Sequence, residues 1–149
     1  MSLFGAKPTL PCDAERILVV DDEAPIRQLF LMILASWLPN LKADEARNGI
    51  EAVRLFNERH HGVILMDLRM PEMDGLQAFL AIQDACQSQT ITMPAVIFCT
   101  GFVPPEGLTG IVGEGTYHCL IRKPARSEEI VRCVMSRLDI IKQQTAIVK

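Results

Sequence analysis

The feature that most constrains this chain is an alternation of short, continuous apolar runs with longer amphipathic stretches. Three runs, at residues 17–20, 63–66 and 95–98, are rich in β-branched side chains and are bounded by polar or turn-forming residues. Continuous apolar runs of this kind are typical of strands that are buried on both faces, as in a parallel sheet. A weaker run at 119–121 and a short candidate at 41–46 bring the predicted strands to five.

The stretches between the runs have the apolar spacing of α-helices. In residues 25–38 apolar side chains recur at i, i+3, i+4 and i+7, and shorter versions of the pattern occur at 49–60 and 74–85. A last helix should follow Ser127, which we expect to be its N-cap. The segment 102–115 carries two prolines and four glycines, so a helix there is predicted to be short or irregular.

Strands that alternate with helices predict right-handed crossovers, which place helices on both faces of one sheet. We therefore expect an α/β fold, a doubly wound five-stranded parallel sheet in a three-layer α/β/α arrangement. We expect the domain to span residues 15–142, between an N-terminal extension at 1–14 and a C-terminal tail at 143–149.

Charge and composition exclude several functional classes. A formal net charge of −3 provides no electrostatic footprint for nucleic acid. No apolar run approaches the roughly 20 residues that a membrane span needs, and the first ten residues lack the pattern of a signal peptide. The five cysteines are scattered without a Cys-x-x-Cys motif, as expected for reduced thiols. We therefore expect a cytoplasmic protein that binds neither nucleic acid nor membrane directly.

Chemically useful side chains follow the predicted strands, at the edge where open parallel sheets bind ligands. Asp21 and Asp22 follow the first strand, Asp67 the third, Thr100 the fourth and Lys123 the fifth. Neighbouring carboxylates repel each other unless a cation compensates their charge, and oxygen ligands without His or Cys suit Mg²⁺ or Mn²⁺. A lysine and a threonine beside them offer a positive charge and a hydrogen-bond donor to an anion. Together these residues predict a site for a metal-bound phosphoryl group.

Each of these residues also has an ordinary structural explanation. Aspartate favours turns and helix N-caps, so Asp22 or Glu23 could simply cap the helix that begins near Pro25. The occurrence of all five residues at strand ends favours a functional site over coincidence.

The same residues resemble the motifs of the response regulator receiver (CheY-like) family. The matching stretches are Val-Val-Asp-Asp-Glu at 19–23 and Met-Asp-Leu-Arg-Met-Pro-Glu-Met-Asp-Gly at 66–75. Thr100 follows an apolar strand, and Lys123-Pro124 follows the last one. Their order and separation fit the family over residues 16–141, which implies the flavodoxin-like fold of that family.

The resemblance implies a metal site around a phospho-acceptor. Asp67 would receive a phosphoryl group from a histidine kinase or a phosphotransfer protein in a two-component His-Asp phosphorelay. Asp22 and Asp67 would ligate Mg²⁺ directly, whereas Asp21 would help through water. Arg69 would contribute its backbone carbonyl.

The resemblance also implies the contacts of the phosphoryl group. Thr100 would turn its hydroxyl onto the phosphoryl oxygens, Gly101 would contact them through its backbone, and Lys123 would pair with them. The family has a cis peptide bond before the proline at the position of Pro124. Arg69 and Phe102 flank the site, and we expect them to set the lifetime of the phosphoryl group.

The implied function is a signalling switch and not an enzyme, with at most weak self-phosphorylation from small phosphodonors and autodephosphorylation. Phosphorylation would shift a conformational equilibrium that controls contacts with a downstream protein, in a monomer or a phosphorylation-dependent homodimer. The family usually has Tyr or Phe three residues before its lysine. Here that position is Leu120, and Tyr117 is out of register, which argues against an aromatic switch coupled to Thr100.

Two other functions remain open from the sequence. One is a pseudo-receiver that keeps the fold for binding without phosphorylation. The other is an Mg²⁺-dependent phosphohydrolase of the haloacid-dehalogenase type, which also uses an aspartyl nucleophile. That family has a second aspartate two residues after its nucleophile, whereas Asp67 is followed at that spacing by Arg69 and Asp21 by Glu23.

Overall fold

The computed structural model describes residues 9–112 and 118–148 of the 149-residue chain. The strands are β1 (Asp13–Val20), β2 (Lys42–Ala46), β3 (His61–Met66), β4 (Ala95–Thr100) and β5 (Cys119–Arg122). The helices are α1 (Ala24–Trp37), α2 (Gly49–Arg59), α3 (Gly75–Gln89), the 3₁₀ turn η1 (Glu106–Leu108), α4 (Thr109–Val112) and α5 (Ser127–Val148). Within these residues no helix combines the length and the apolar character that crossing a membrane needs.

All five strands are parallel and lie in one sheet, in the order β2-β1-β3-β4-β5. The chain leaves β1 toward one edge of the sheet and then adds β3, β4 and β5 toward the other edge. In a doubly wound sheet, a ligand-binding crevice forms beyond the carboxyl ends of the strands at such a reversal. Val20 pairs with both Ala46 and Met66, so the first three strands end at the same level. Asp21 and Asp67 therefore leave the sheet side by side.

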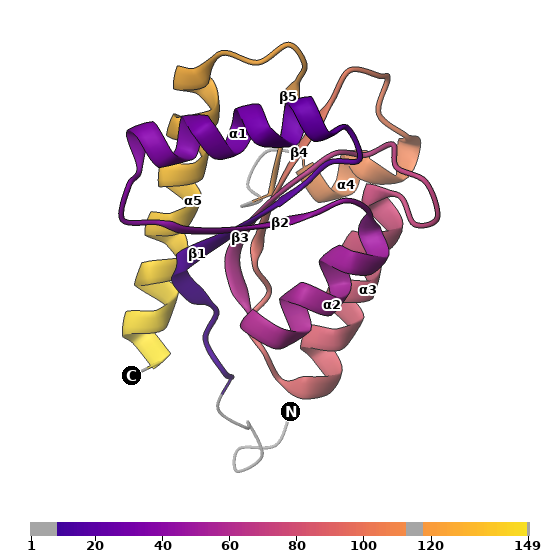
Figure 1. Cartoon of the computed structure of the whole chain (residues 1–149). Helices are drawn as coiled ribbons and strands as arrows, with labels where there is room; N and C mark the ends of the chain where they lie inside the picture. The colour runs from indigo at the N-terminus through magenta and orange to yellow at the C-terminus, as the bar shows by residue number, and fades with distance from the viewer. Residues whose placement is uncertain (1–8, 113–117, 149) are drawn as a thin grey trace.

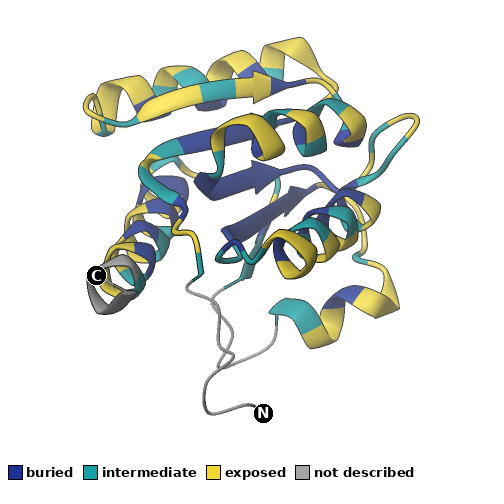
Figure 2. Ribbon diagram, turned by 90° about the horizontal axis from the view of Figure 1, so that it is seen from below, coloured by how far each residue is buried: buried dark blue, intermediate teal, exposed yellow. Residues whose placement is uncertain are grey.

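Helices cover both faces of the sheet and make three layers (Figure 1). α1 contacts α5 on one face, and α2 contacts α3 on the other. Every residue of β3 and β4 is buried, and Figure 2 shows a dark core of strands between helices whose outer surfaces are exposed. Burial on both faces explains why these strands have continuous apolar sequences. The predicted three-layer, doubly wound α/β fold is confirmed.

The fourth helix is short and irregular, as predicted. α4 contains four residues and follows the single 3₁₀ turn of η1. Pro104 and Pro105 precede this segment and have no N–H to donate, and Gly107 and Gly110 lose more backbone entropy in a helix than other residues do. The prediction for Tyr117 falls outside the described residues.

Regular structure extends beyond residues 15–142, which stay the predicted bounds of the domain. β1 begins at Asp13, and Leu10 forms an isolated bridge with Ile91. A bridge between residues 81 positions apart leaves no local sequence pattern. At the other end, α5 continues through the expected tail. α5 also begins at Ser127, which therefore lies in the first turn of the helix instead of preceding it.

Candidate functional site

The aspartates that follow β1 and β3 are positioned by the sheet itself. The N–H of Asp21 donates to the carbonyl oxygen of Ala46 at 3.2 Å, and the N–H of Asp67 donates to that of Val20 at 2.9 Å. Both aspartates are buried, with exposed fractions of 0% for Asp21 and 6% for Asp67. Backbone pairing thus continues one residue beyond the strands and fixes two carboxylates at the carboxyl edge of the sheet.

Asp22 completes a cluster of three carboxylates. One oxygen from each of Asp21, Asp22 and Asp67 lies within 4.8 Å of the others. Asp22 is exposed, so the cluster opens to solvent on that side. Carboxylate oxygens without His or Cys form a donor set that suits a hard cation such as Mg²⁺. Helix capping does not explain these residues, because the N-cap of α1 is Glu23 and its side chain makes no capping hydrogen bond.

Lys123 contacts two of the three carboxylates. Its Nζ donates to Oδ2 of Asp21 at 2.8 Å and lies 3.5 Å from Oδ2 of Asp67. The backbone holds the lysine in place, because its N–H donates to the carbonyl oxygen of Thr100 at 2.9 Å. The Lys123–Pro124 peptide bond is cis. One ammonium therefore compensates two buried negative charges, which repel each other.

The site shifts the pKa values of both Asp67 and Lys123. Burial raises the pKa of Asp67 above its ordinary value, although the charge of Lys123 acts in the opposite direction. Burial alone would lower the pKa of Lys123, but the hydrogen bond to Asp21 and the charge of Asp67 raise it above its ordinary value. Lys123 therefore stays charged at neutral pH, and the carboxylates depend on it for compensation.

Thr100 and Gly101 lie at the end of β4, beside this cluster. Thr100 is buried, and its Oγ1 accepts a hydrogen bond from the N–H of Phe102 at 3.2 Å. A Cβ added to Gly101 would meet only Cβ of Lys123, at 3.9 Å, which is an ordinary contact. Packing within the fold therefore does not require glycine at this position, and the open space beside its backbone is available to an approaching group.

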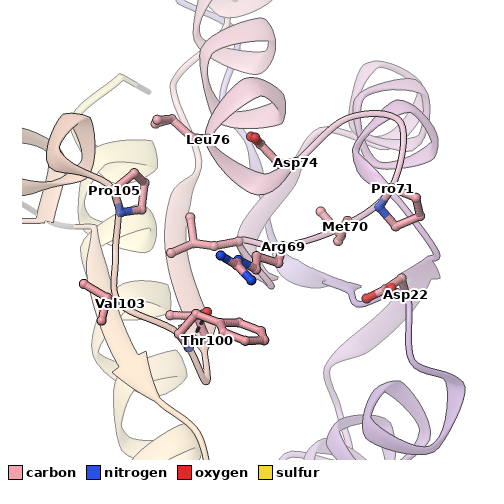
Figure 3. A pocket seen from close by; sticks show the side chains of 11 residues that line it. Asp22, Arg69, Met70, Pro71, Asp74, Leu76, Thr100, Val103 and Pro105 are labelled. Carbon is pink, nitrogen blue, oxygen red and sulfur yellow. Dashed lines mark hydrogen bonds between the residues drawn. The ribbon is translucent and has the colours of Figure 1, made fainter.

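A pocket of about 750 Å³ opens at this edge. Figure 3 shows Arg69 between Thr100 and Asp22 in the view into the pocket. The guanidinium of Arg69 lies over the ring of Phe102, with its Cζ 4.2 Å from the ring centroid. The lining residues are Asp22, Leu68, Arg69, Met70, Pro71, Asp74, Leu76, Thr100, Phe102, Val103 and Pro105. Asp22 is the member of the carboxylate cluster that lines the pocket, and Phe102, Val103 and Pro105 form an apolar side at the loop after β4.

The loop between Asp67 and α3 is shaped by close backbone contacts. The N–H of Gly75 donates to the carbonyl oxygen of Leu68 at 2.9 Å. A Cβ at Gly75 would overlap the carbonyl oxygen of Asp67 and lie 3.0 Å from Cα of Leu68. The start of α3 is fixed by a capping box in which Asp74 and Gln77 exchange hydrogen bonds. These contacts fix the segment that follows Asp67.

Arg27 supports the site but is not among the residues predicted from the sequence. It is buried in α1, where its Nη1 donates to the carbonyl oxygen of Asp21 and its Nε to Oε1 of Glu45, both at 2.8 Å. A signal was present, because Arg27 falls three and seven residues before Phe30 and Leu34, the buried apolar face of α1. A cation on an apolar helical face needs a buried partner.

Leu120 lies apart from this pocket. It pairs with Phe98 in the β4–β5 ladder and packs against the core. It is not among the residues that line the pocket. An aliphatic side chain at this position cannot make the hydrogen bond of a tyrosine hydroxyl.

The sequence is similar to those of known proteins. The family model of the response regulator receiver domain matches residues 17–135 of the chain. Regulatory protein AtoC of Escherichia coli (strain K12) is 34% identical over 125 residues, which cover 84% of this chain and 25% of that protein. Transcriptional regulatory protein SrrA of Staphylococcus aureus is 39% identical over 82 residues, which cover 55% of this chain and 33% of that protein. The chain thus spans a quarter to a third of the length of these curated relatives.

Solved structures show the same fold. A response regulator receiver domain protein (CheY-like) from Methanospirillum hungatei JF-1 is similar with a TM-score of 0.71 and 25% identity, covering 88% of this chain and 99% of that chain. A two component transcriptional regulator AraC from Clostridium phytofermentans ISDg is similar with a TM-score of 0.73 and 27% identity, covering 88% and 98%. With a family match that runs from β1 into α5, this chain belongs to the response regulator receiver domain family of two-component systems.

Proposed function

We propose that this chain is a phospho-acceptor in a His-Asp phosphorelay, in which Asp67 takes a phosphoryl group from a histidine kinase or a phosphotransfer protein with the help of Mg²⁺. The observation that carries the proposal is the contact of Lys123 with two buried carboxylates beside an open pocket. Membership of the family supports it, because receiver domains are generally signalling switches and not enzymes.

Asp67 is the carboxylate that would form the new bond. Its Oδ1 lies 3.4 Å from the N–H of Arg69, and its Oδ2 faces Nζ of Lys123 at 3.5 Å. These two neighbours orient the carboxylate at the base of the site. One oxygen would bond to phosphorus as the bond between phosphorus and the donor's imidazole nitrogen breaks, and the imidazole would leave with the bonding electron pair.

Three carboxylates would hold the cation. Asp22 and Asp67 are the proposed direct ligands for Mg²⁺, with Mn²⁺ as an alternative ion, and Asp21 would help through water. When bound, the ion neutralises negative charge where phosphoryl oxygens approach carboxylates. The backbone carbonyl of Arg69 stays a proposed further ligand. Arg27 would act as a positioning residue, because it fixes the carbonyl of Asp21 from the side of α1.

Thr100, Gly101 and Lys123 are the proposed contacts of the phosphoryl group. The hydroxyl of Thr100 is linked to the N–H of Phe102, which begins the loop toward η1 and α4. If this hydroxyl turned to donate to a phosphoryl oxygen, its hydrogen bond with the N–H of Phe102 would change. Such a contact shifts the fold only if it differs between two conformers. We therefore expect this loop and the short α4 to transmit the change to a downstream protein, with no direct binding of nucleic acid or membrane.

The intact mass of the chain tests the proposal directly. The parent, Asp67→Asn and Asp74→Asn would each be incubated with Mg²⁺ and acetyl phosphate. Asp74→Asn is a matched control at the edge of the same pocket, because asparagine also serves as an N-cap for α3. We expect one phosphoryl adduct on the parent and on Asp74→Asn, and none on Asp67→Asn or without Mg²⁺.

A second donor separates the alternatives. A phosphotransfer protein that carries phosphohistidine would be offered to the folded parent under the same conditions. If neither donor phosphorylates a folded, Mg²⁺-binding parent, the proposal is wrong and the pseudo-receiver alternative is favoured. An adduct that persists in Asp67→Asn would assign the acceptor to another residue.

A further inference from the structure

Every polar group of Asp21 has a hydrogen-bond partner in the structure. Its N–H donates to the carbonyl oxygen of Ala46 at 3.2 Å. Its carboxylate accepts from the N–H of Glu23 at 2.9 Å and from Nζ of Lys123 at 2.8 Å. Its carbonyl oxygen accepts from Nη1 of Arg27 at 2.8 Å. Asp21 is therefore fixed through its backbone as well as through its side chain.

The bond from Arg27 acts on the peptide group that joins Asp21 to Asp22. The carbonyl of Asp21 and the N–H of Asp22 belong to one planar unit, so a donor that fixes the carbonyl also fixes the direction in which the chain enters Asp22. Asp22 is exposed, so little packing restrains its side chain and its placement depends on the backbone. The guanidinium of Arg27 therefore orients a proposed direct ligand of the cation from the side of α1.

Arg27 is in turn held by Glu45. Its Nε donates to Oε1 of Glu45 at 2.8 Å, in an ion pair in which the side chain of Arg27 is 8% exposed and that of Glu45 is 44% exposed. Gln28, the next residue of α1, also donates from Nε2 to Oε1 of Glu45, at 3.4 Å. A guanidinium that is buried to this extent needs a partner for its charge and its donors. Glu45 supplies that partner at the border between protein and solvent.

Strand register brings Glu45 to this position. Glu45 belongs to β2, an edge strand of the sheet, and pairs with Val19 of β1. Successive side chains of a strand point to opposite faces. Asp44 accordingly pairs with Arg59 of α2, whereas Glu45 pairs with Arg27 of α1. The alternation along β2 thus places the carboxylate of Glu45 on the face of the sheet that α1 covers.

We propose that Glu45 is a positioning residue for the divalent cation. It holds the guanidinium of Arg27, which holds the peptide group between Asp21 and Asp22. A side chain on the edge strand would thereby control how tightly the carboxylate cluster binds the ion, although Glu45 is not a member of that cluster. The inference rests on the proposed function, because it requires that the cluster binds Mg²⁺, but it does not require that Asp67 is phosphorylated.

Two substitutions at Glu45 separate hydrogen bonding from charge. Glu45→Gln and Glu45→Ala remove the same negative charge, but the Oε1 of glutamine can still accept from Nε of Arg27. Positioning predicts that Glu45→Ala binds the cation about tenfold more weakly than Glu45→Gln, the lower end of the effects of residues that orient metal ligands. An effect of charge alone would weaken both variants equally.

Arg27→Met tests whether Glu45 acts through the guanidinium. Once the guanidinium is absent, Glu45 has no group to hold, so Glu45→Ala should weaken binding no further in that background. Equal weakening by Glu45→Ala with and without Arg27 would overturn the proposed chain of contacts.

The affinity of the full chain for Mn²⁺ is the measurement, with the free ion followed by electron paramagnetic resonance and with Mg²⁺ as a competitor. This dissociation constant is obtained without any phosphodonor. Each variant would be titrated under conditions in which circular dichroism and urea unfolding show that it is folded. Glu58→Gln is the matched control for net charge, because Glu58 pairs with Arg54 on the exposed side of α2, and it should bind the ion as the parent does.

The outcomes distinguish this inference from the proposed cation site. If the parent binds the ion, equal dissociation constants for Glu45→Gln and Glu45→Ala would overturn this inference alone. A loss of stability in Glu45→Ala without weaker binding would do the same, because a purely structural residue gives that result. A parent that binds Mn²⁺ no more tightly than Asp22→Asn would overturn the cation site and this inference together. The comparison at the half-exposed Glu45 does not depend on whether Arg27→Met folds.

Discussion

The ammonium of Lys123 donates a hydrogen bond of 2.8 Å to Asp21, a residue 102 positions earlier in the chain. The same ammonium lies 3.5 Å from Asp67, so one side chain at the end of β5 compensates carboxylates at the ends of β1 and β3. A cation that neutralises two buried charges serves both the stability and the chemistry of this edge, because removal of either partner leaves a charge that the protein cannot solvate.

Replacement of Lys123 by methionine should therefore destabilise the fold and make its stability depend on a divalent cation. The free energy of unfolding should fall by about 1–3 kcal/mol, because Asp21 and Asp67 lose their shared counter-charge. Mg²⁺ should raise the midpoint of urea unfolding more in this variant than in the parent. Lys42→Met, at an exposed position of β2, is the matched control and should change little. An equal effect of Mg²⁺ on parent and Lys123→Met would contradict the shared compensation.

The loop after Asp67 should not tolerate a side chain at Gly75. Gly75→Ala places a methyl group against the backbone of Asp67 and Leu68, so the loop must move. We expect a loss of about 1–3 kcal/mol in unfolding free energy, the cost of forcing extra volume into a packed region, and less phosphorylation by acetyl phosphate. Gly110→Ala is the control, since nothing lies within 4 Å of its added Cβ, and it should be neutral or stabilising. Similar stabilities for the two variants would show that the contact at Gly75 is not tight.

The stacked pair of Arg69 and Phe102 should set the lifetime of the phosphoryl group. Arg69→Ala removes the guanidinium that lies over the ring at the pocket and opens the site to water, so the acyl phosphate should decay several-fold faster. The fold should lose no more than about 1 kcal/mol, the usual range for an exposed cation–π contact. The decay of phosphorylated chain, followed by intact mass after removal of the donor, measures the effect. Equal decay rates in Arg69→Ala and the parent would rule out this role.

The stability of the fold should decrease in mildly acidic solution because of His118. Burial, with a smaller contribution from Arg137, lowers the pKa of His118 from 6.5 to about 4. Between these values the unfolded chain binds a proton that the folded chain does not, so the unfolding free energy falls as pH falls from 6.5 to about 4. Burial lowers the pKa of His61 as well, and that histidine acts in the same direction.

His118→Asn isolates the contribution of His118. The Nδ1 atom accepts a hydrogen bond from the N–H of Val96 at 2.9 Å, and the Oδ1 of asparagine can accept the same bond without titrating. The unfolding free energy of the parent should therefore depend more steeply on pH than that of the variant, by up to about 1 kcal/mol per pH unit after allowance for partial exposure. Urea titrations at several pH values give both slopes, and parallel slopes would assign the pH dependence to other groups.

The local sequence contains enough to predict the fold class. β3 and β4 are continuous apolar runs because both of their faces are covered, and the amphipathic stretches between strands have the spacing of helices that cover a sheet. The short α4 follows from prolines and glycines that lie within the segment itself. The residues of the candidate site could also be predicted from the sequence, because residues that directly follow parallel strands converge at one edge once the sheet forms.

Only the tertiary structure decided which of these residues touch and what supports them. Contacts that join distant segments include the bond between Lys123 and Asp21, the support of Asp21 by Arg27 and the bridge of Leu10 with Ile91. Periodicity and turn chemistry are properties of neighbours along the chain, so a sequence displays them directly. Contacts between distant segments depend on strand register and on how each helix packs against the sheet, and these are fixed only when the whole core assembles.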